Sequence, residues 1–177
     1  MLVHSEQWCS TDINIPNTLL HLLPDWLNVP ILEHLTLRCD LKDYPDFPVV
    51  LHVPWLHSVT LIGLCQMDPV ILPWDQVKTL HIEGYGMQYY LKQCPNLVNL
   101  MLNEQDCRGH KSTTPLMVIK LDSLKSLHVI AHGKNCFMLD RLSTPHLSDF
   151  DMFSLILTKI LSTPSGPSSS ARAVWKL

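Results

Sequence analysis

Charged residues are scarce in this sequence, at 16% of its 177 residues against roughly 25% in typical soluble proteins. The formal net charge is only -3, and the Lys and Arg residues are dispersed rather than gathered into a basic stripe. Nucleic acids and anionic membranes attract proteins chiefly through concentrated positive charge. The composition therefore argues against both as partners.

Long hydrophobic runs are also missing, because the longest ones are short and broken by His, Asp or Pro. A membrane-spanning helix needs about 20 consecutive apolar residues, so none is predicted. The opening MLVHSEQWCS lacks a basic stretch followed by an apolar one, which is the pattern of a secretory signal. We expect an intracellular protein, in the cytoplasm or the nucleus.

Catalytic and metal-binding motifs are absent as well. The six cysteines stand singly and none forms a C-x-x-C pair, so we expect reduced thiols rather than disulfides. The ten histidines show no set of four ligands at the spacing of a zinc site, and no motif marks a nucleophile. We therefore expect no enzyme, no metal site and no cofactor. A cysteine–histidine hydrolase stays open as the alternative.

What the chain does contain is a repeat of the form P-x-L-x-x-L-x-L, in which Pro is absent from two copies. The first apolar positions begin 20 to 27 residues apart, within the window of roughly 20–29 residues that is typical of leucine-rich repeats. The apolar triplets are Leu32-Leu35-Leu37, Leu56-Val59-Leu61, Val77-Leu80-Ile82, Leu97-Leu100-Leu102, Leu124-Leu127-Val129 and Leu147-Phe150-Met152. A weaker seventh copy in STDINI would place Ile13 and Ile15 in the last two positions.

This spacing has a physical reading. The last two apolar residues alternate along a short strand and point into the core, while the first fills the turn that enters the strand. One unit cannot bury its apolar row alone, but stacked units can. The predicted fold is α/β: an irregular leucine-rich-repeat solenoid, with a parallel sheet on the concave side and short helices and loops on the convex side. We expect helices within 17–27, 86–94 and 135–143.

The predicted domain spans residues 1–161 and holds about six to seven repeats. Residues 162–177 are rich in Ser and Pro, which predicts a disordered tail. Regular repeats carry Asn or Cys three residues after the last leucine. Here those positions hold Asp40, Leu64, Tyr85, Gln105, His132 and Leu155, so we expect no asparagine ladder and irregular curvature.

Residues 4–153 resemble the leucine-rich-repeat region of fungal F-box proteins, especially those of basidiomycetes. The resemblance is carried by LPWDQVKTLHI (72–82), LKQCPNLVNLML (91–102) and LDRLSTPHLSDFDM (139–152). It implies a non-enzymatic module that binds protein partners, such as substrates of a ubiquitin ligase. No segment resembles the F-box itself, so we expect a truncated product whose contact with the ligase adaptor is in doubt. A non-functional fragment is a further alternative.

The residues that flank the inward apolar positions should face outward and form the partner surface of such a module. They mix polar groups with a few apolar ones, as protein-recognition surfaces do. One row comprises Thr36, Thr60, His81, Met101, His128 and Asp151. A second row comprises Arg38, Ile62, Glu83, Asn103, Ile130 and Phe153. A third comprises His34, Ser58, Thr79, Asn99, Ser126 and Asp149. This composition predicts that the surface binds a protein partner.

Overall fold

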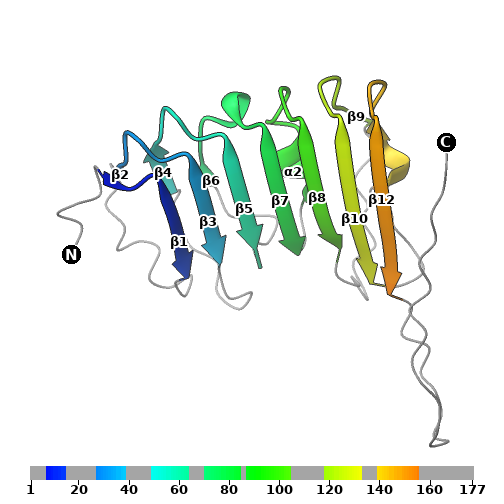
Figure 1. The fold of residues 1–177 in the computed structure, drawn as a ribbon, viewed down its shortest axis with the longest axis horizontal. Coiled ribbons are helices and arrows are strands. Elements are labelled where there is room, and N and C mark those ends of the chain that lie inside the picture. Colours follow the sequence, from blue (N-terminus) through cyan, green and yellow to red (C-terminus); the bar gives the residue numbers. More distant parts are fainter. Residues whose placement is uncertain are drawn as a thin grey trace, which may run out of the picture.

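The computed structural model describes residues 7–14, 27–38, 49–63, 70–84, 87–104, 118–132 and 139–155. Their main feature is a sheet of seven parallel strands that follow one another in chain order, from β1 in blue to β12 in orange (Figure 1). The strands are β1 (Ser10–Asn14), β3 (His34–Arg38), β5 (Ser58–Ile62), β7 (Thr79–Gly84), β8 (Asn99–Glu104), β10 (Ser126–His132) and β12 (Asp149–Leu155). The predicted repeat solenoid on a parallel sheet is confirmed. The predicted tail at 162–177 lies outside the described residues.

The register of the sheet brings equivalent positions of the repeats side by side. The first strand position of the motif forms one continuous row, and the second forms another. The first row is Leu35, Val59, Leu80, Leu100, Leu127 and Phe150; the second is Leu37, Leu61, Ile82, Leu102, Val129 and Met152. A slip of one residue would turn an apolar row outward, so burial selects this register.

The turn before each strand explains the remaining apolar position and the proline. The backbone N–H of Leu32 donates to the carbonyl oxygen of Val29 (3.0 Å), which closes a four-residue turn with Pro30 as its second residue. Proline is favoured there because its fixed φ suits that position and no N–H is needed. The same bond recurs in the other repeats, at Leu56 to Val53, Val77 to Trp74, Leu97 to Cys94, Leu124 to Leu121 and Leu147 to Thr144.

Opposite the main sheet, the structure differs from the expected helices. Short parallel strands occupy much of this side: β2 (Leu27–Asn28), β4 (Val49–His52) and β6 (Val70–Ile71) form one sheet, and β9 (Ile119–Lys120) pairs with β11 (Leu142–Ser143). Helix on this side consists of α2 (Met87–Leu91) and two 3₁₀ turns, η2 (Trp74–Gln76) and η3 (Leu139–Arg141), within the part of the chain that the structure describes. Of the helices predicted at 86–94 and 135–143, the structure shows only the single turns α2 and η3. Most of 17–27 lies outside the described residues. Val and Ile are frequent in these return strands and favour extended backbone.

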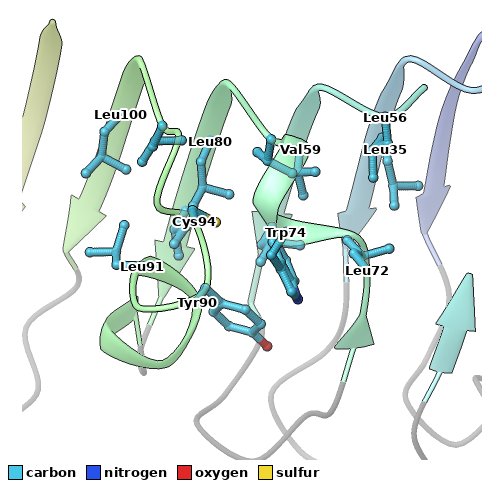
Figure 2. Packing of buried hydrophobic residues seen from close by; sticks show 14 of the residues in the cluster. Leu35, Leu56, Val59, Leu72, Trp74, Leu80, Tyr90, Leu91, Cys94 and Leu100 are labelled. Carbon is cyan, nitrogen blue, oxygen red and sulfur yellow. The ribbon is translucent and has the colours of Figure 1, made fainter. Parts of the chain in front are cut away.

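The core lies between the main sheet and this second layer. Figure 2 shows leucines of the strands pointing toward Trp74, Tyr90, Leu91 and Cys94, which come from the turns and from α2. The rings of Trp74 and Tyr90 lie 5.3 Å apart, centroid to centroid. Each buried aliphatic side chain contributes roughly 1.5–3 kcal/mol, so the stacked rows supply the driving force for folding.

Two expectations need correction. Thr11 pairs with Leu35 and Ile13 pairs with Leu37, so these two residues occupy the inward strand positions of the first repeat. The predicted placement of Ile13 and Ile15 in these positions is therefore wrong by two residues. Thr11 breaks the leucine pattern, which is why the sequence suggested the later pair. Trp55 directly follows Pro54 at the entrance to its repeat, a position that predicts a residue filling the turn or the core, but it lies on the surface of its turn with 68% of its area exposed.

The row structure predicts the effect of Leu80→Ala. Leu80 is fully buried in β7, with an apolar neighbour in the strand on either side. The truncation should lower the free energy of unfolding by about 2–5 kcal/mol, because it removes buried surface and leaves a cavity. Urea denaturation followed by circular dichroism measures the change. Val118→Ala, at a side chain that is 61% exposed, is the matched control and should stay within about 0.5 kcal/mol. Equal effects of the two substitutions would contradict the assigned core.

Candidate protein-binding face

The face of the main sheet opposite the core, called the outer face below, carries the side chains between the buried ones. Side chains alternate along a strand, so residues between two buried positions point the other way. The register aligns Thr36, Thr60, His81, Met101, His128 and Asp151 in a central row. Beside it, in the same register, run Arg38, Ile62, Glu83, Asn103, Ile130 and Phe153. All twelve predicted residues therefore lie on one face, in adjacent strands about 4.8 Å apart.

The sequence missed the contribution of β1 to this face. Asp12 continues the central row next to Thr36, and Asn14 continues the second row next to Arg38. The Arg38 Nε donates to both carboxylate oxygens of Asp12, at 3.2 Å each. Both side chains are about half exposed, so the ion pair adds at most about 1 kcal/mol, but it orients the guanidinium. Correct placement of Ile13 in its repeat position would have revealed Asp12.

The third row adds hydrogen bonds between neighbouring strands. The Asn99 side-chain amide donates to the Thr79 hydroxyl, and the Ser126 hydroxyl donates to a carboxylate oxygen of Asp149, each over 3.2 Å. Such pairs restrict the rotamers of side chains that would otherwise move freely in water. These two pairs thus hold four polar side chains of the outer face in preferred positions before any partner arrives.

His81 lies near the middle of the outer face and is half-buried. Its Nε2 is buried and has no hydrogen-bond partner among the described residues. Burial lowers the pKa of His81 below its ordinary value of 6.5; the carboxylate of Glu83 opposes this effect, while His128 and Arg38 add to it. The imidazole is therefore neutral at neutral pH.

At the β10–β12 end the outer face becomes acidic and aromatic. The His128 Nδ1 lies 3.6 Å from a carboxylate oxygen of Asp151, and the His128 ring lies 5.3 Å from the ring of Phe153. Asp149 stands on the same strand in the third row. Acidic groups outnumber basic ones over the described rows, because Arg38 is their only cation apart from any protonated histidine.

The cysteines that the structure describes, Cys9 and Cys94, bear on the hydrolase alternative. Cys94 is fully buried at a repeat turn, and burial raises the pKa of its thiol to about 12. A thiol with that pKa forms almost no thiolate at neutral pH and is a poor nucleophile. The sequence predicts that Cys39, Cys65 and Cys94 pack near repeat turns; Cys39 and Cys65 lie outside the described residues.

One group of possible metal ligands was not expected from the sequence. Glu33, His34 and His57 each offer a ligand atom, and these atoms lie within 4.8 Å of one another. The expectation of no metal-ligand cluster rested on local spacing, whereas this one joins two consecutive repeats. The signal was present, since Glu33 and His57 both directly follow the first apolar residue of their repeats.

Comparisons with known proteins do not place the chain in a family: no family model, no curated protein and no solved structure matches it. Within the described part of the chain, none of the helices has the length and apolar character needed to span a membrane.

The lowered pKa of His81 predicts how stability depends on pH. As the pH falls through the ordinary histidine pKa of 6.5, the unfolded chain binds a proton that folded His81 resists, so stability decreases. His81→Gln removes this contribution. Between about pH 7.5 and about pH 5, the urea midpoint of the wild type should therefore fall further than that of the variant. Above this range His81 is neutral in both states, so the difference between the two proteins should not change with pH. Parallel curves throughout would show that His81 does not contribute.

Burial also predicts which thiols react in the native state. Iodoacetamide should label exposed Cys9 in the folded protein and should reach Cys94 only after denaturant is added. Peptide mass spectrometry of the two samples measures the modified fraction of each cysteine. Rapid labelling of Cys94 in the native protein would contradict its burial and would support the alternative of a cysteine–histidine hydrolase.

Proposed function

We propose that the chain is a non-enzymatic protein-interaction module that binds a protein partner through the outer face. The observation that carries the proposal is the alignment of the predicted residues in adjacent rows, side by side across consecutive parallel strands. Solenoids commonly use such continuous surfaces to bind other proteins. The face combines hydrogen-bonding side chains with Met101, Ile62, Ile130 and Phe153, a mixture that suits protein recognition.

The rigidity of the face supports this role. The backbone of each strand is held on both sides by the parallel ladder, except at β1 and β12, the edges of the described sheet. The Asp12–Arg38 ion pair and the Asn99–Thr79 hydrogen bond hold individual side chains. A surface ordered in advance loses less entropy on binding, so more of the contact energy appears as affinity.

The charge distribution indicates the kind of partner surface that fits. Glu83 lies on β7, and Asp149 and Asp151 lie on β12. A partner surface with basic groups opposite these strands is therefore favoured. Such contacts speed association and weaken with salt, whereas contacts with Met101 and Phe153 do not depend on salt in this way.

The resemblance to the repeat region of fungal F-box proteins extends the proposal to a specific role. In this role the bound partner is a substrate of a ubiquitin ligase, and the chain is the recognition part of a substrate adaptor. Its support is the resemblance of residues 72–82, 91–102 and 139–152, together with the repeat solenoid on which those segments lie.

A site-specific photocrosslinker tests the proposal. Benzoylphenylalanine replaces Met101 in the centre of the outer face or, as the control, Tyr89, an exposed residue of α2 on the other side of the core. After irradiation in a basidiomycete lysate, we expect one or a few proteins to crosslink at position 101 and not at position 89. Mass spectrometry identifies them, and cullin-ligase subunits or ubiquitinated proteins among them would support the adaptor role.

The same experiment can contradict the proposal. Equal crosslinking at both positions, or recovery of chaperones alone, would mean that the outer face has no selective partner. Asp149→Lys/Asp151→Lys provides the second measurement, because it reverses the charge of the acidic end without touching the buried rows. It should weaken capture of a partner that has been identified at position 101.

A further inference from the structure

The cluster of Glu33, His34 and His57 lies at the end of the sheet where β3 and β5 begin. The rings of His34 and His57 meet edge to face, with centroids 4.9 Å apart and planes inclined at 68°. The His34 Nε2 lies 4.0 Å from a carboxylate oxygen of Glu33. Three ligands, two imidazoles and one carboxylate, thus come from two repeats, and their side chains are exposed or half-exposed.

The backbone holds this cluster in place. The carbonyl oxygen of Glu33 accepts hydrogen bonds from the N–H groups of both His57 and Ser58, at 3.1 Å each. The N–H groups of Glu33 and His34 donate in turn to the carbonyl oxygen of Cys9. The ligand-bearing residues therefore sit at fixed positions of the hydrogen-bond ladder rather than on a free loop.

The orientation of His57 adds an independent observation. Its Nδ1 lies 3.2 Å from the carbonyl oxygen of Trp55, an acceptor that selects the tautomer with the proton on Nδ1. The Nε2 atom then carries the free lone pair. Histidines that bind metals commonly hold their second nitrogen in this way, and the bond orients the ring and raises its basicity.

We propose that Glu33, His34 and His57 bind a divalent transition metal, with Zn²⁺ as the favoured ion. Two imidazoles and one carboxylate suit Zn²⁺, whereas Ca²⁺ and Mg²⁺ prefer sites made of oxygen ligands. Around tetrahedral Zn²⁺ the ligand atoms lie about 3.3 Å apart, given Zn–N distances of about 2.0–2.1 Å. The present atoms lie within 4.8 Å, so rotation of exposed side chains brings them to that separation. The fourth position is open to water or to another donor. His34 also belongs to the third row of the outer face, so the site borders the proposed partner surface, but metal binding does not require a partner.

Isothermal titration of ZnCl₂ into the full chain, purified without a histidine tag, tests the proposal. We expect one Zn²⁺ per chain, and a loss of affinity of at least about tenfold in His57→Ala and in His34→Ala, because even the loss of an outer-shell partner costs that much. His146→Ala and His52→Ala are the matched controls, since each removes an exposed imidazole outside the cluster. They should retain wild-type affinity.

Circular dichroism and urea denaturation of every variant separate loss of a ligand from loss of the fold. Co²⁺ supplies a second readout, because its visible absorption reports ligand type and geometry. Nitrogen and oxygen ligands should give d–d bands without the thiolate charge-transfer band that coordination by nearby Cys9 would produce. Absence of Zn²⁺ binding by the wild type, or equal affinity in His57→Ala and His146→Ala when both are folded, would overturn the proposal.

Discussion

The structure depends on one hydrogen-bond arrangement that every repeat shares. In each turn, a single carbonyl oxygen accepts two consecutive N–H groups from the next repeat, just before the strand begins. The acceptors are Cys9, Glu33, His57, Lys78, Val98 and Lys125. Parallel strands have no hairpin turn to set their register. These shared acceptors and the buried rows set it instead, and both the core and the outer face follow from that register.

The apolar rows could be predicted from sequence because burial enforces them strictly. A polar residue in an inward position would lose its hydration without gaining a hydrogen-bond partner. Apolar residues therefore fill these positions, and their spacing can be recognised in the sequence. In five repeats the first residue of the turn, three positions before the first apolar residue, is also buried, but it was not predicted from the sequence. Val29, Val53, Trp74, Cys94 and Leu121 occupy it, and such a mixture of side chains leaves no simple pattern. The return strands were not predicted for another reason. They are two to four residues long, which is too short to show an alternation of apolar and polar residues.

The outer face followed from the same alternation, so its rows were predictable wherever the apolar rows were. The prediction failed at β1, where Thr11 occupies an inward position and hides the register of Asp12. Contacts between repeats are harder to foresee. Glu33 and His57 are distant in sequence and meet only because both hold the same position in consecutive repeats. Equivalent repeat positions, rather than local spacing, bring such residues together.

The division between inward and outward positions also shows where function can reside. Inward residues are constrained by packing and outward ones are not, so the outer face can change its chemistry without loss of the fold. His81 is the exception, because its Nε2 is buried although it belongs to an outward row. In a neutral imidazole one nitrogen donates a hydrogen bond and the other accepts one, and leaving either buried without a partner costs free energy. The fold carries this cost at an outward position, and the same burial lowers the pKa of the imidazole.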